Sequence, residues 1–110
     1  MLVALTKALV CRDYARAEVT TAAIVHLGTT YAAKMTKDGK RCVCVEVSVE
    51  TNALRQRHDG SDPTTGASGN GAPLAVNAFY SLFGSKNVAE LRLIGLSDTG
   101  YAHIHFYYEK

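Results

Sequence analysis

A glycine-rich turn at residues 66–71 is the first candidate ligand-binding site in this sequence. The sequence around it reads GASGNGAPL, and Pro73 suits the first turn of a helix, where its missing N–H is not needed. The backbone N–H groups of Gly69, Asn70 and Gly71 would then lie just before a helix and could offer donors and a positive dipole end to a carboxylate. The turn could equally serve only to cap that helix.

Two histidines, His103 and His105, are a second candidate, because a His-x-His pair on one strand can supply two metal ligands. Cys42 and Cys44 share a face of another predicted strand in the same way, and His58 is a further possible ligand. A metal site would require the two strands to be adjacent and in register. The alternative is a sheet face of mixed composition, which the spacing favours, so we predict no metal and no cofactor.

Other chemistries have less support. The turn lacks the lysine of a phosphate-binding loop and the parallel strand–turn–helix unit of a dinucleotide site. A cysteine nucleophile paired with histidine has no local signature. Arg55 and Arg57, together with Tyr101, Tyr107 and Tyr108, could bind single-stranded nucleic acid, but a net charge of +2 argues against nucleic acid as a partner.

Several secondary-structure elements that would help to position these residues are predicted in the first half of the chain. Residues 2–17 place Leu2, Leu5, Leu9 and Tyr14 near one face of a predicted helix. A second short helix is predicted in EVTTAAIVHLG, with a cap at Thr20 or Thr21 and an end at Gly28. Residues 29–35 could be helix or strand, and Lys37-Asp38-Gly39-Lys40 is typical of a hairpin turn.

The second half begins with the clearest strand, residues 41–50, in which Val43, Val45, Val47 and Val49 alternate with polar residues and cysteines. We expect the valines to face the core and Cys42 and Cys44 to face away. A long polar loop follows over residues 51–68. A helix from Pro73 ends at Gly84, and residues 88–96 and 101–108 are predicted to form an antiparallel hairpin. On its second strand Ala102, Ile104, Phe106 and Tyr108 share one face, and Tyr101, His103, His105 and Tyr107 share the other.

These elements predict an α+β fold with a small antiparallel sheet and helices packed on one face. The 110 residues indicate a single domain, with an N-terminal helical segment at 1–35 and a sheet–helix–hairpin unit at 36–110. The hydrophobic fraction of 47% is enough for a core, and three cysteines with no obvious pairing favour a reduced, cytoplasmic protein. No segment approaches the length of a membrane span.

The stretch GNGAPLAVNAF, followed by a strand that ends in HIHFYYE, resembles the C-terminal regulatory domain of the 2-isopropylmalate synthase and citramalate synthase family. The segment Ser68-Gly69-Asn70-Gly71-Ala72-Pro73-Leu74 is similar to the glycine-rich turn of that family, with Ala72 as an extra residue. The upstream segment EVTTAAIVHLGTTY resembles the linker that precedes the domain. Tyr101 stands where the family often has an acidic residue, and the catalytic barrel is absent.

The resemblance implies a regulatory domain and not an enzyme. In that family two copies pair, and an amino acid or related small acid binds near their interface. The ligand-binding residues that it implies here are Gly69, Asn70, Gly71, Leu74, Ala75, Ala102 and His103. The alternative is a protein-interaction or assembly module without a ligand, which would use the aromatic face of the last strand. The partners that we expect are a second copy and a small carboxylate metabolite, with no membrane.

Overall fold

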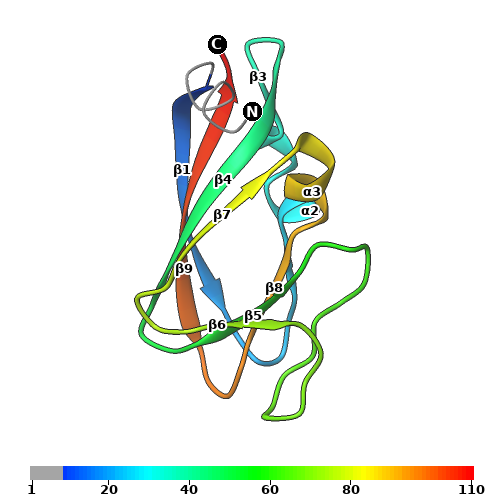
Figure 1. The fold of residues 1–110 in the computed structure, drawn as a ribbon, viewed down its shortest axis with the longest axis vertical. Helices are drawn as coiled ribbons and strands as arrows, with labels where there is room; N and C mark the ends of the chain where they lie inside the picture. The colour runs from blue at the N-terminus through cyan, green and yellow to red at the C-terminus, as the bar shows by residue number, and fades with distance from the viewer. Residues whose placement is uncertain (1–8) are drawn as a thin grey trace.

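Strands dominate the structure. The computed structural model describes residues 9–110, and the chain is 51% strand and 13% helix, arranged as two antiparallel sheets with short helices beside them (Figure 1). The predicted α+β fold, with helices packed on one face of a small sheet, is therefore wrong. Within residues 9–110 the helices are too short and too polar to cross a lipid bilayer.

Sheet A has the strand order β1-β9-β4-β3, and β7 also pairs with β4; sheet B has the order β2-β8-β5-β6. The strands of sheet A are β1 (Leu9–Val19), β3 (Thr36–Lys37), β4 (Lys40–Glu50), β7 (Phe79–Phe83) and β9 (Gly100–Glu109). Those of sheet B are β2 (Val25–His26), β5 (Leu54–Arg57), β6 (Ala72–Leu74) and β8 (Arg92–Gly95). The helices are α2 (Leu27–Thr30), the 3-10 helix η1 (Ala32–Lys34) and α3 (Ser85–Glu90).

The strand β9 lies between β1 and β4 and pairs with both along most of its length. Its side chains alternate as the sequence predicts. Ala102, Ile104, Phe106 and Tyr108 are fully buried, whereas the residues between them are exposed or half-buried. This period of two gives sheet A one apolar inner face and one mixed outer face.

The core lies between the inner face of sheet A, sheet B and the two α-helices. Leu54 and Leu93 of sheet B, Leu27 of α2 and Val88 of α3 belong to the same buried cluster as the inner residues of β9. The helices α2 and α3 lie side by side beside the sheets (Figure 1). They approach so closely that a Cβ on Gly28 would stand 2.5 Å from the carbonyl oxygen of Ala89.

The N-terminal helix predicted at residues 2–17 is wrong where the structure describes it, because residues 9–19 form β1. Its residues 2–8 lie outside the described range. Ala15, Ala17 and Val19 turn toward the core while Arg16 and Glu18 point away, which is the alternation of a strand. The helix predicted after Thr20 is replaced by a turn, in which Thr20 Oγ1 accepts from the N–H of Ala23 at 3.2 Å, and by β2. The pairing partner β9 is too distant in sequence for a local pattern to indicate it.

The helix predicted from Pro73 is also wrong. Pro73 lies in β6 at the edge of sheet B, where a residue without an N–H costs no ladder hydrogen bond. Asn77 has a φ of 67°, which turns the chain from β6 into β7 of the other sheet. Leu74 and Leu82, spaced like neighbours on a helix, are both buried, but they reach the core from different sheets.

The predicted hairpin of residues 88–96 and 101–108 is wrong as well. Residues 85–90 form α3, and β8 pairs with β2 and β5 in sheet B while β9 lies in sheet A. The turn at residues 96–99 therefore carries the chain from one sheet to the other. The other predicted hairpin is confirmed, since β3 and β4 pair at Lys37 and Lys40 across Asp38 and Gly39, whose φ angles are 52° and 75°.

A β-bulge changes the expected faces of β4. The pairing with β9 shifts between Cys42 and Cys44, so Val43 is the extra residue. Cys42 consequently joins the core beside Tyr108, whereas Cys44 pairs with Tyr107 on the outer face. The prediction that both cysteines share a face is wrong for this reason.

We predict that Ile104→Ala will lower the free energy of unfolding by about 2–5 kcal/mol, because it removes a fully buried side chain from the central strand. The adjacent His105→Ala, on the outer face, should change it by no more than about 0.5 kcal/mol. Urea denaturation followed by circular dichroism measures both variants. Equal losses would contradict the assigned faces of β9.

Candidate functional site

The outer face of sheet A is four strands wide and combines aromatic, acidic and imidazole side chains. Register pairing places its residues in rows across β1, β9, β4 and β7. We define this outer face by Tyr14, Arg16 and Glu18; Tyr101, His103, His105 and Tyr107; Cys44, Glu46, Ser48 and Glu50; and Phe79, Ser81 and Phe83. Phe79 is 69% exposed and Tyr14 is 45% exposed, which is unusual for side chains of this size.

A chain of hydrogen bonds crosses this face through His103. Its Nε2 lies 2.9 Å from Glu50 Oε1, and its Nδ1 lies 2.5 Å from the hydroxyl of Tyr14. Because the carboxylate only accepts, a neutral imidazole carries its proton on Nε2 and accepts from Tyr14 at Nδ1. The hydrogen bond from His103 lowers the pKa of Glu50 below its ordinary value, and Arg16 adds to the effect.

The other carboxylates of the face are also paired within it. The Tyr107 hydroxyl donates to Glu46, and this bond, together with desolvation, raises the pKa of Tyr107 to about 12. The Tyr101 hydroxyl donates to Glu18 at 3.4 Å. The guanidinium of Arg16 lies 3.8 Å from the centre of the Tyr101 ring, in a cation–π contact. The polar groups of this face therefore largely satisfy one another.

Cys44, which is buried, is one of the residues that line a small hollow in this face. The hollow has a volume of about 80 Å³ and is lined by Leu9, Cys44, Glu46, Ser81, Phe83 and Tyr107. Burial, with a smaller contribution from Glu46, raises the pKa of Cys44 to about 11. Burial likewise raises the pKa of Cys42 to about 11. Both thiols are therefore protonated and weakly nucleophilic at neutral pH.

The glycine-rich turn has a different environment from the one expected. It ends a loop of residues 58–71 that is held by the buried side chain of Arg55, which is 7% exposed. The guanidinium donates to the carbonyl oxygens of Gly71 at 2.9 Å, Gly66 at 2.8 Å and Ala67 at 3.2 Å. A Cβ on Gly69 would stand 2.1 Å from the Thr64 carbonyl oxygen and 2.9 Å from Arg55 Nε, so only glycine fits there.

Two of the three N–H groups proposed for carboxylate binding, those of Gly69 and Asn70, already have partners in this loop. The N–H of Gly69 donates to Gly66 at 3.1 Å, and that of Asn70 donates to Thr64 Oγ1 at 2.6 Å. A strand follows the turn in place of a helix, so no helix dipole adds to the site. Ligand binding at Gly69, Asn70 and Gly71 stays a prediction, and a ligand there would have to displace these bonds.

The remaining predicted ligand residues do not converge. Leu74 is buried in β6, and Ala75 is exposed in the turn after it. Ala102 is fully buried on the inner face of sheet A, whereas His103 points to the outer face. Adjacent residues of a strand point to opposite sides, so one small ligand cannot contact both side chains.

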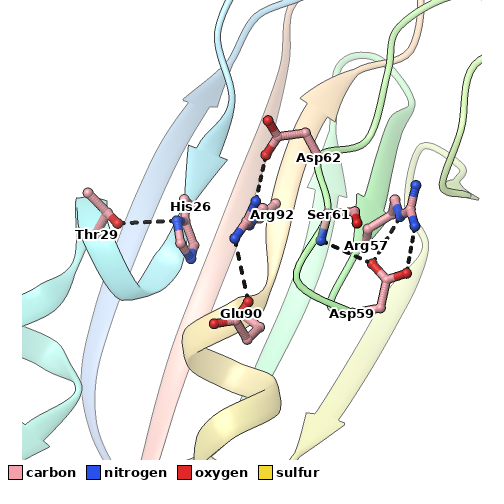
Figure 2. Close-up of polar contacts among 8 residues, drawn as sticks. All are labelled: His26, Thr29, Arg57, Asp59, Ser61, Asp62, Glu90 and Arg92. Carbon is pink, nitrogen blue, oxygen red and sulfur yellow. Dashed lines mark hydrogen bonds and ion pairs between the residues drawn. The ribbon is translucent and has the colours of Figure 1, made fainter.

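A group of charged residues holds the first part of the loop against β8 and α3 (Figure 2). Arg92 donates to Asp62 at 2.8 Å and to Glu90 at 3.5 Å. Arg57 forms two hydrogen bonds with Asp59, and this pairing lowers the pKa of Asp59 to about 2. These carboxylates are occupied by arginines of the same chain.

The predicted candidates for a metal site also separate. Cys42 and Cys44 point to opposite sides of β4, so they cannot join His103 and His105 in one cluster. Across residues 9–110 no group of three histidine, cysteine, aspartate or glutamate side chains is placed to hold a metal ion.

Comparisons with models of known protein families, with curated proteins and with solved structures found no match to this chain. The resemblance to the regulatory domain of the 2-isopropylmalate synthase family therefore stays a prediction. The outer face of sheet A brings together aromatic, acidic and imidazole side chains from four strands. The sequence predicted the residues that β9 contributes to this face, but not those of β1. The alternation of Ala15, Ala17 and Val19 with Arg16 and Glu18 could have indicated that strand.

We predict that only Cys11 will be alkylated rapidly by iodoacetamide at pH 8. It is exposed, whereas Cys42 and Cys44 are buried and have raised pKa values of about 11. Peptide mass spectrometry of the native protein identifies the labelled cysteine, with the denatured protein as the control in which all three react. Rapid labelling of Cys44 in the native protein would contradict its assigned environment.

We also predict that Arg55→Met will loosen the loop of residues 58–71. Three carbonyl oxygens lose a charged donor, so the free energy of unfolding should fall by about 1–3 kcal/mol. Amide hydrogen exchange should accelerate at residues 66–71. Arg57→Met is the matched control, because its partner Asp59 is exposed and only two positions away, and it should leave that exchange unchanged. Unchanged exchange in Arg55→Met would show that the loop does not depend on this side chain.

Proposed function

We propose that this chain is a non-enzymatic binding domain that assembles as a homodimer through the outer face of sheet A. The observation that carries the proposal is the composition of this face, which presents the exposed aromatic side chains of Phe79 and Tyr14 on one sheet surface. Monomeric proteins rarely leave such a patch in water, and Tyr, Phe and Arg are the residue types that protein interfaces favour.

The internal pairing of the polar groups supports burial of this face. Glu18, Glu46 and Glu50 each have a partner on the same face. Burying a charge is costly when it has no partner, and these groups would enter an interface already hydrogen-bonded. The hollow lined by Phe83 and Tyr107 adds a place for an anchoring side chain from the partner.

The charges on the face favour a second copy as the partner. The face carries both signs, with the carboxylates of Glu18, Glu46 and Glu50 beside the guanidinium of Arg16. A polyanion such as nucleic acid would meet the glutamates, and a strongly acidic or basic protein would find no matching excess of charge. An identical face, which offers both signs and the same aromatic side chains, avoids this conflict.

The open position of His103 argues against catalysis at this residue. The hydrogen bonds that join Glu50, His103 and Tyr14 resemble those of a site in which a carboxylate and a histidine activate a hydroxyl group. This group lies on an open surface, however, where the Glu50 side chain is 56% exposed. Water would compete for any reacting group at such a site. The buried thiols are not activated either. All three cysteines are free, which supports a reducing, cytoplasmic compartment.

We predict a mass of twice 11.8 kDa in light scattering across the micromolar range. Phe79→Asp should raise the dissociation constant of the dimer by about tenfold or more, since it places a charge on the exposed aromatic part of the face. Val76→Asp is the matched control, because Val76 is also exposed but lies in the β6–β7 turn, outside the face. A monomer at all these concentrations, or equal effects of the two variants, would contradict the proposal.

A further inference from the structure

A second surface of the molecule, whose lining includes none of the residues that define the proposed interface, contains a hollow of the size of a small ligand. The hollow has a volume of about 230 Å³ and lies between the β3–β4 hairpin and α3, lined by Met35, Thr36, Arg41, Cys42, Ser85, Lys86 and Ala89. Pockets for drug-sized ligands have volumes of about 300–1,000 Å³, so an occupant of this hollow would be small.

The charged groups of the lining all have the same sign. Arg41 and Lys86 are its ionisable residues besides the Cys42 thiol, and burial keeps that thiol neutral by raising its pKa to about 11. Neither cation forms an ion pair with a residue in the part of the chain that the structure describes. Thr36 and Ser85 add hydroxyl groups, which can donate to an anion.

Two carboxylates on neighbouring elements, those of Asp13 and Glu90, are already engaged with other cations. Asp13 accepts from Lys34 at 2.8 Å and from Lys37 at 3.4 Å, and the hydrogen bond from Lys34 lowers the pKa of Asp13. Glu90 on α3 pairs with Arg92 at 3.5 Å. The positive charges of Arg41 and Lys86 are therefore left for a ligand.

The rest of the lining is apolar. Met35, Cys42 and Ala89 contribute hydrocarbon and sulfur surface, and Cys42 is 1% exposed, so it belongs to the floor where the pocket meets the core. A ligand that matches this arrangement has one anionic group for the cations and a short apolar tail for the floor.

We propose that this pocket binds a small metabolite with an anionic headgroup and a short apolar tail, and that Arg41 and Lys86 hold the headgroup. A carboxylate and a phosphate monoester share this chemistry. The proposal stands independently of the dimer, because the lining contains none of the residues of the outer face of sheet A.

Isothermal titration calorimetry and thermal shift with three probes test the proposal. They are 4-methyl-2-oxopentanoate, butyl phosphate and inorganic phosphate, with 4-methylpentanamide as a neutral control. We expect saturable binding of one or both of the anions that carry an apolar tail, 4-methyl-2-oxopentanoate and butyl phosphate. The compound that binds then identifies the headgroup as a carboxylate or a phosphate. Inorganic phosphate and the amide should bind at least about tenfold more weakly. No binding of either tailed anion, or equal binding of inorganic phosphate, overturns the proposal.

Variants locate the binding site. Arg41→Gln and Lys86→Gln should each weaken binding by about fivefold or more, because each removes one of two charges beside the headgroup. Lys40→Gln is the matched control, since it removes the same charge from the same hairpin but lies outside the lining. Circular dichroism confirms that each variant is folded. If Lys40→Gln weakens binding as much as Arg41→Gln, the attraction is a general effect of charge and the assigned pocket is wrong.

Discussion

The pairing of β9 with β1 on one side and with β4 on the other decides which side chains of sheet A are buried. Because side chains alternate along a strand, this register sends Ile104, Phe106 and Tyr108 into the core and His103, His105 and Tyr107 to the outer face. A slip of one residue would exchange the two sets and bury the histidines. The same pairing therefore builds the core and assembles the candidate interface.

The second sheet is organised by a buried cation. Arg55 projects from β5 and collects three carbonyl oxygens of the loop at residues 58–71, while Arg92 fastens the start of that loop through Asp62. The glycines of the turn serve this packing, since Gly69 allows the close approach to Arg55 and Thr64. A glycine-rich sequence that looks like an anion site can thus be a loop whose carbonyls surround an arginine.

The sequence predicted best what is decided locally. The alternation of β9 and the turn at Asp38 and Gly39 depend on neighbouring residues, and both are confirmed. The identity of β1, the separation of β8 from β9, and the bulge at Val43 depend on partners far away in the chain. Pro73 illustrates the difficulty, because a proline suits the start of a helix and an edge strand equally well. The outer face could be predicted only one strand at a time, since its rows join residues that the pairing alone brings together.

The proposed assembly through the outer face of sheet A can be tested by recording amide chemical shifts as the protein is diluted. In ¹⁵N-labelled protein, dilution from millimolar to low micromolar concentration should shift the amide resonances of Ser48, Phe79 and His103. The amides of Gly66 and Gly69, in the loop beyond sheet B, should keep their positions. Spectra that do not change with concentration, or changes confined to the loop and sheet B, would contradict the claim.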